Sequence, residues 1–63
     1  MKIYRVCVES YLSNNSEVKE YNNYYCKAKS WKEAEAYAKR CIENWNKQSE
    51  GVIYNIYDLT PHN

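Results

Sequence analysis

The chain has 63 residues, enough for one domain with a small core and too few for two. Its formal net charge is +1, with nine Lys and Arg residues against eight Asp and Glu residues. This balance argues against a strongly basic nucleic-acid binder, whose affinity comes largely from neutralised phosphates, and equally against an acidic mimic of DNA. Hydrophobic residues make up 44% of the chain and charged residues 27%, which is typical of a folded domain.

The first element predicted along the chain is a strand over residues 2–11, because apolar and polar side chains alternate there. One face is uniformly apolar and is predicted to point to the core: Tyr4, Val6 and Val8. The other face carries Ile3, Arg5, Cys7, Glu9 and Tyr11. The polar stretch 12–17 then predicts a hairpin loop, since Asn14 and Asn15 tolerate left-handed backbone conformations.

A second strand is predicted over residues 18–29. One of its faces becomes small and apolar towards the end, which would let a helix approach closely, so we expect it to point inward. That face carries Asn22, Tyr24, Cys26 and Ala28. The opposite face is expected to point outward and carries Tyr21, Asn23, Tyr25, Lys27 and Lys29.

A helix is predicted over residues 30–48. Ser30 and Glu33 have the spacing of a capping box, in which the Ser30 side chain accepts from the Glu33 N–H group while the Glu33 side chain reaches back to the start of the helix. Apolar side chains then recur at helical spacing and form one stripe: Trp31, Ala34, Ala38, Cys41, Ile42 and Trp45. One side of the helix is therefore expected to pack on a sheet.

A third strand is predicted over residues 52–59, after the single glycine, Gly51, and residues 60–63 are expected to form a short flexible tail. Both faces of this strand are apolar, because Val52, Tyr54 and Ile56 alternate with Ile53, Tyr57 and Leu59. A strand that is apolar on both faces suggests that its outer face also meets something.

These elements predict a single α+β domain of β-β-α-β order over residues 1–59. A right-handed crossover through the helix makes the second and third strands parallel to each other. The first strand then fits between them, which gives a three-stranded antiparallel sheet of order 2-1-3. One helix covers one face of this sheet, and no segment is left to cover the other. A function is therefore expected on the uncovered face.

Neither a catalytic site nor a metal or cofactor site is predicted. Cys7, Cys26, Cys41 and His62 could supply four zinc ligands, but their spacings match no ligand motif. A cysteine nucleophile needs a base within hydrogen-bond reach, and the only histidine lies in the predicted tail. A chain with one glycine also has no glycine-rich loop to hold phosphate. We therefore expect a protein that is not an enzyme.

An odd number of cysteines without a C-x-x-C pair favours free thiols in a reducing compartment over a disulfide scaffold. The first residues, "MKIYRVCVES", interleave charges with apolar residues and lack the apolar core of a signal peptide. No apolar run approaches the roughly 20 residues that span a bilayer. We expect a cytoplasmic protein without membrane contact.

The uncovered face is predicted to bind another protein, because tyrosine gives a large contact area at low entropic cost. The expected contact residues are Arg5, Tyr11, Tyr21, Tyr25 and Lys27. Two alternatives stay open. Single-stranded nucleic acid could stack on the same rings, although Glu9 shares the face. Two copies could also form a homodimer, by stacking their sheets or by pairing their second strands edge to edge.

The run "YYCKAKSWKEAEAYAK" combines a strand, a capping box and a helix, and it resembles a pattern of many small proteins of phages and mobile elements. In size, in its richness in Asn, Tyr and Lys and in its lack of catalytic groups, the chain is similar to the accessory proteins of this kind, which include anti-CRISPR inhibitors. The resemblance implies a stoichiometric inhibitor that binds and blocks a host enzyme or nucleoprotein complex. It is one of protein type and assigns no site residue.

Overall fold

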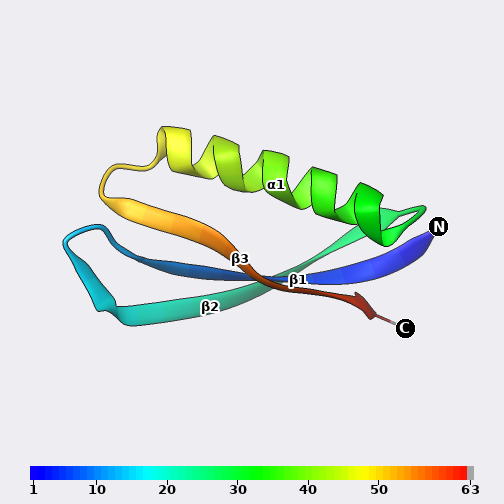
Figure 1. Cartoon of the computed structure of the whole chain (residues 1–63), viewed down its shortest axis with the longest axis horizontal. Coiled ribbons are helices and arrows are strands. Elements are labelled where there is room, and N and C mark those ends of the chain that lie inside the picture. The colour runs from blue at the N-terminus through cyan, green and yellow to red at the C-terminus, as the bar shows by residue number, and fades with distance from the viewer. Residues whose placement is uncertain (63) are drawn as a thin grey trace.

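The computed structural model describes residues 1–62 and contains three strands and one helix. The strands are β1 (Lys2–Leu12), β2 (Asn15–Ala28) and β3 (Val52–His62), and the helix is α1 (Trp31–Gln48). The sheet has the order β2-β1-β3, with β1 antiparallel to both neighbours. The helix runs along one face of the sheet (Figure 1). The predicted α+β class and the strand order 2-1-3 are therefore confirmed.

The core lies between α1 and the sheet face that the helix covers. Its buried hydrophobic residues are Tyr4, Val6, Val8, Ala28, Ala34, Ala38, Ile42 and Leu59. The two helix alanines lie one turn apart on one side of α1, and their small size lets the helix approach the strands. Tyr24 and Cys26 are half-buried against the same cluster. The inward faces predicted for the first two strands are thus confirmed for these residues, while Asn22 on the same face stays exposed.

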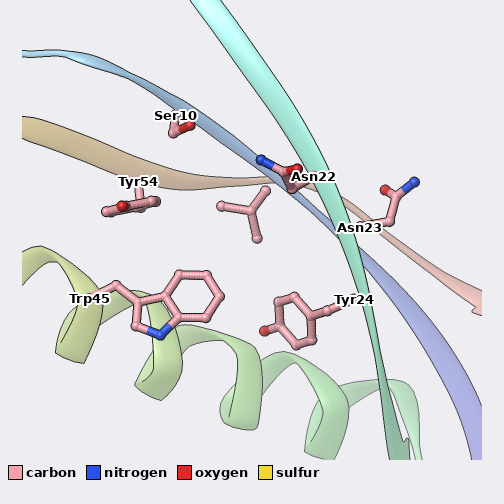
Figure 2. A pocket seen from close by; sticks show the side chains of 7 residues that line it. Ser10, Asn22, Asn23, Tyr24, Trp45 and Tyr54 are labelled. Atoms are coloured by element: carbon pink, nitrogen blue, oxygen red, sulfur yellow. The ribbon is translucent and has the colours of Figure 1, made fainter.

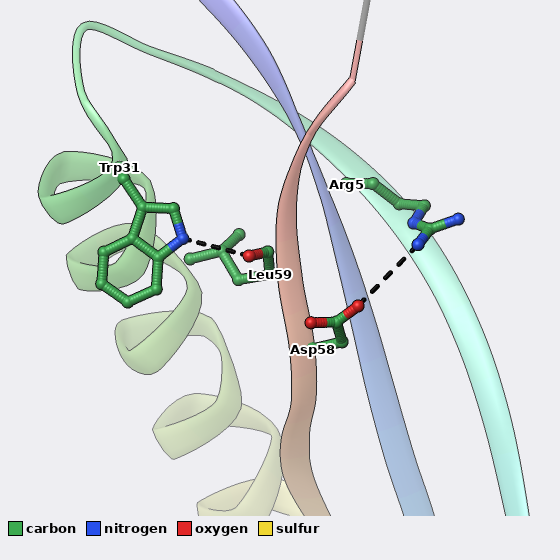
Figure 3. A network of polar contacts seen from close by, with 4 residues as sticks. All are labelled: Arg5, Trp31, Asp58 and Leu59. Atoms are coloured by element: carbon green, nitrogen blue, oxygen red, sulfur yellow. Dashed lines mark hydrogen bonds and ion pairs between the residues drawn. The ribbon is translucent and has the colours of Figure 1, made fainter.

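Side-chain hydrogen bonds fix both ends of α1. At the start, the Ser30 hydroxyl accepts from the Glu33 N–H group at 3.2 Å, and the Glu33 carboxylate accepts from the Lys29 N–H group at 3.1 Å. The Trp31 indole donates to the Leu59 carbonyl at 3.0 Å, which ties the first turn to β3 (Figure 3). Near the other end, the Asn46 side chain forms two hydrogen bonds with the backbone of Tyr54 in β3. It donates to the Tyr54 carbonyl at 3.0 Å and accepts from the Tyr54 N–H group at 2.8 Å.

The hairpin between β1 and β2 is tighter than predicted. Leu12 already pairs with Asn15, so the turn itself consists of Ser13 and Asn14. Residues 16–18 have no partner in β1, because the next pair joins Tyr11 to Lys19. The expectation of a loop through residue 17 was wrong because the pair of Leu12 with Asn15 closes the turn two residues after β1, and the chain from Asn15 on is already extended.

A β-bulge at Tyr57 changes which residues of β3 face the core. Cys7 pairs with Asp58 and Val8 pairs with Ile56, so Tyr57 has no partner in β1. The extra residue shifts the alternation by one position. Leu59 is therefore buried on the same side as Ile56, and not on the opposite side as a strict period of two predicts.

β3 also continues three residues beyond the predicted end at Leu59. Thr60, Pro61 and His62 pair with Arg5, Tyr4 and Ile3 of β1. The prediction of a tail is wrong for these three residues, and Asn63 lies outside the described part of the chain. A proline is tolerated here because β3 is an edge strand. Some backbone N–H groups of an edge strand point away from the sheet, so the N–H group that proline lacks is not needed for the ladder.

Candidate functional site

The sheet face opposite α1, which we call the outer face, is built from all three strands. β1 supplies its central row: Ile3, Arg5, Cys7, Glu9 and Tyr11. β2 supplies Lys19, Tyr21, Asn23, Tyr25 and Lys27. β3 supplies Ile53, Asn55, Tyr57, Asp58, Thr60 and His62. All five predicted contact residues thus lie on one face, where Arg5 is directly opposite Tyr25 across the strand pair.

Two aromatic pairs on the outer face reach from β2 to β3 across the central strand. The ring centroids of Tyr21 and Tyr57 are 4.9 Å apart in an edge-to-face arrangement, and those of Tyr25 and His62 are 4.8 Å apart. Such pairs are favourable and fix the direction of each ring. Tyr21 remains 51% exposed and Tyr25 54% exposed. The face therefore presents large aromatic surfaces in orientations that are set before any contact is made.

Tyr57 and His62 are members of this face that sequence reasoning did not assign to a site. The bulge concealed the position of Tyr57, and His62 was placed in the predicted tail. The sequence carries no local signal for the bulge, because both faces of β3 are apolar and the inward direction of Ile56 and Leu59 follows only from their pairing with Val8 and Val6 of β1.

Most charges on the outer face are paired within the chain. The Arg5 guanidinium lies 3.8 Å from the Asp58 carboxylate (Figure 3), and the Lys19 ammonium lies 3.8 Å from the Glu9 carboxylate. The Lys19 ammonium is also 5.7 Å from the centroid of the Tyr11 ring. Exposed pairs of this kind stabilise a fold by at most about 1 kcal/mol each. Their larger effect is to offset the positive charge of the face.

The Tyr21 hydroxyl joins this charge network from β2. It donates a hydrogen bond to the Glu9 carboxylate at 3.3 Å. Desolvation, followed by the charge of Glu9 and this hydrogen bond, raises the pKa of Tyr21 above its ordinary value. The hydroxyl is therefore protonated at neutral pH and acts as a donor.

A cavity lies on the other side of the sheet, between the second half of α1 and the strands (Figure 2). Its volume is about 370 Å³, and no charged side chain lines it. Its lining residues are Val8, Ser10, Asn22, Asn23, Tyr24, Trp45 and Tyr54. The Trp45 ring packs edge to face on Tyr24 and on Tyr54, with centroid distances of 5.7 and 5.6 Å. These three rings pack the second half of the helix against the sheet. The small buried residues of the helix, Ala34 and Ala38, lie in its first half.

The Tyr24 hydroxyl beside this cavity is buried, and no described group meets the geometry of a hydrogen bond to it. The Cys41 thiol is close enough to influence its titration, but thiols are weak hydrogen-bond partners. Burial, followed by the nearby thiols of Cys41 and Cys26, raises the pKa of Tyr24 to about 12. Burial also raises the pKa of Cys26. The hydroxyl of Tyr24 is thus a cost to the fold rather than a contact within it.

We expect Tyr24→Phe to leave the free energy of unfolding at pH 7 unchanged or to raise it by up to about 1 kcal/mol, because the variant removes a buried, unpaired hydroxyl. Above pH 10 the two proteins should diverge. The unfolded chain releases the Tyr24 proton near pH 10, whereas the folded chain keeps it to about pH 12, so the wild type loses stability as the pH rises through this window. The loss should be at most roughly 2 kcal/mol for this partly exposed ring.

Urea denaturation of both proteins at pH 7 and at several values between pH 10 and pH 12 measures this difference. Tyr25→Phe, which removes a hydroxyl from an exposed ring, is the matched control at pH 7. Equal alkaline slopes for the wild type and Tyr24→Phe would show that Tyr24 titrates in the folded chain as it does in the unfolded one.

The described residues contain no other arrangement that suggests a site. Within residues 1–62, no three His, Cys, Asp or Glu side chains gather as a metal ion would require, and no helix is both long and apolar enough to cross a membrane. Cys7, Cys26 and Cys41 are free thiols. The chain matches no protein-family model, and comparisons with curated proteins and with solved structures give no match.

Proposed function

We propose that this chain is a non-enzymatic binding protein whose outer face docks on another protein. The observation that supports this proposal is the group of exposed aromatic rings on a sheet face that none of the described elements covers: Tyr21, Tyr25 and Tyr57. Aromatic residues are enriched in the cores of protein interfaces, and tyrosine combines a large apolar area with one polar group. The cross-strand aromatic pairs lower the cost of ordering these rings on binding.

The charges of the outer face favour a protein partner over single-stranded nucleic acid. Phosphate binding needs cations that are free to replace counterions. On this face Arg5 is held by Asp58 and Lys19 is held by Glu9, and both carboxylates would lie beside a bound phosphate chain. Among the predicted contact residues, Lys27 alone carries a positive charge without a described carboxylate partner, so stacking on the tyrosines would receive little electrostatic support.

The identity of the partner is a further part of the proposal. The resemblance to small accessory proteins of phages and mobile elements supports a role as an inhibitor that occupies a surface of a host enzyme or nucleoprotein complex, in the manner of anti-CRISPR proteins. This support comes from size and composition alone. The free cysteines fit action in the reducing cytoplasm, where thiols persist.

Tyr25→Ala should weaken binding to the partner at least tenfold, which corresponds to about 1.4 kcal/mol, because truncation of a central interface aromatic commonly costs this much or more. The thermal midpoint should change little, since the ring is 54% exposed. Affinity capture from lysate of the source cell, followed by titration of the captured protein, measures the effect. Tyr37→Ala is the matched control, because Tyr37 is 42% exposed on α1 at the other side of the molecule.

Equal capture by wild type and Tyr25→Ala, combined with loss of capture by Tyr37→Ala, would move the contact surface to the helix. A fluorescence titration with labelled single-stranded oligonucleotides covers the alternative function. Oligonucleotide binding that weakens steeply with added salt would favour nucleic acid, and not a protein, as the partner.

A further inference from the structure

The two edges of the sheet are protected to different degrees. On β3, the Asn46 side chain occupies both the N–H group and the carbonyl of Tyr54, and Pro61 removes a backbone donor. β2 has 14 residues with neither glycine nor proline, and no described strand pairs with its other side. Long unprotected edges of this kind pair readily with another strand. β2 is therefore the edge at which a strand of a second chain would add.

We propose that the added strand is β2 of a second copy, paired antiparallel about a two-fold axis at Asn22, so that two sheets join into one of six strands. This proposal concerns the edge of β2, whereas the function proposed above concerns the outer face, and Tyr25 and Lys27 border both surfaces. A two-fold axis normal to the sheet keeps both helices on one side and both outer faces on the other. It also requires that a residue meets its own copy on the axis, which leaves only a few possible registers.

Charge selects among these registers. An axis at Asn23 would oppose Lys19 to Lys27, and an axis at Tyr24 would oppose Lys19 to Lys29. An axis at Glu20 would place that residue opposite its own copy. Like charges directly opposite each other on paired strands are destabilising. An axis at Tyr21 avoids such clashes but brings no opposite charges together.

The axis at Asn22 places Glu17 opposite Lys27 twice, once on each side of the axis. Neither residue forms an ion pair with another described residue of its own chain, although the neighbouring charges Glu9 and Lys19 do. Two exposed ion pairs contribute little affinity, but they distinguish one register from its alternatives. The dimer thus pairs two charges that have no ion-pair partner among the described residues of the single chain.

The same register gives an exposed apolar residue a neighbour. Val18 lies on the helix side of β2 and is 65% exposed, because α1 does not reach that part of the strand. About the axis at Asn22 it stands opposite Cys26 of the second copy, close to the end of β2 that α1 covers. On the other side of the sheet, Lys19 stands opposite Tyr25 of the second copy, so the two outer faces become one continuous surface.

Analytical ultracentrifugation of the whole chain, over a range from about 10 μM to 1 mM that suits a small interface, tests the dimer. The wild type should shift from monomer to dimer across this range. Lys27→Glu should weaken the dimer roughly tenfold or more, because it replaces two attractions by two repulsions. Lys32→Glu makes the same charge change on the helix surface and should leave the dimer unaffected. Glu17→Lys combined with Lys27→Glu should restore it.

A wild type that stays monomeric at every concentration would overturn the proposal. A dimer that is insensitive to Lys27→Glu would overturn this register and edge. Because Tyr25→Ala tests the outer face by capture of a different protein, failure of the dimer and failure of the proposed function give different results.

Discussion

We expect Val6→Ala to lower the free energy of unfolding by about 2 kcal/mol, since it removes two buried methyl groups and leaves a cavity in the core. Val6 is fully buried, with an exposure of 0%, and among the described residues it has the largest fully buried side chain. It lies in the central strand and therefore contacts both the helix layer and its neighbours in the sheet. In a domain of this size, such a loss lowers the thermal midpoint by roughly 8–16 °C.

Val18→Ala is the matched control because it makes the same chemical change on a side chain that is 65% exposed. It should alter the free energy of unfolding by no more than about 0.5 kcal/mol. Thermal and urea denaturation followed by circular dichroism compare the two variants, at the lowest protein concentration that the signal permits, so that self-association does not contribute. Equal losses in both variants would contradict the assignment of Val6 to the centre of the core.

Deletion of Tyr57 should leave the fold intact. The deletion removes the residue of β3 that has no partner in β1, so Asp58 and Leu59 would stay opposite Cys7 and Val6 in a regular ladder. Leu59 would therefore remain in the core and Asp58 would remain on the outer face. The free energy of unfolding should change by no more than about 1 kcal/mol.

Tyr57→Ala separates the role of the position from the role of the ring. This variant keeps the bulge and should change the free energy of unfolding by no more than about 1 kcal/mol, because the ring is exposed. Circular dichroism and the dispersion of amide signals in a heteronuclear NMR spectrum report whether each variant is folded. A deletion variant that unfolds would show that the fold depends on the bulge.

The architecture was predictable because its signals are local and strong. The capping box at Ser30 and the alternation of Tyr4, Val6 and Val8 each depend on residues close together in the chain, and both appear in the structure. The errors concern features set by pairing with a distant strand. β3 continues to His62 because it pairs there with the first residues of β1. The tight turn depends on a change of register between β1 and β2, which falls between Tyr11 and Leu12.

The same distinction applies to the outer face. Alternation sufficed to place Tyr21 and Tyr25 on it, because β2 is regular at these positions. The rings that pair with them come from β3, where the bulge and the underestimated strand length concealed Tyr57 and His62. The ion pair of Arg5 and Asp58 could not be predicted from the sequence either. The two residues are not directly opposite each other in the ladder, and their side chains meet diagonally across the two strands.

The ion pairs of Arg5 and Lys19 have a kinetic consequence for any macromolecule that docks on the outer face. A surface whose cations are matched by nearby carboxylates exerts little long-range attraction on an approaching partner. Encounter would then be limited by diffusion and by the need for correct orientation, at rates of roughly 10⁵–10⁶ M⁻¹s⁻¹ that respond weakly to ionic strength. The lifetime of a complex would therefore depend on how well the tyrosine rings fit the partner after contact, and tight binding would take the form of slow dissociation.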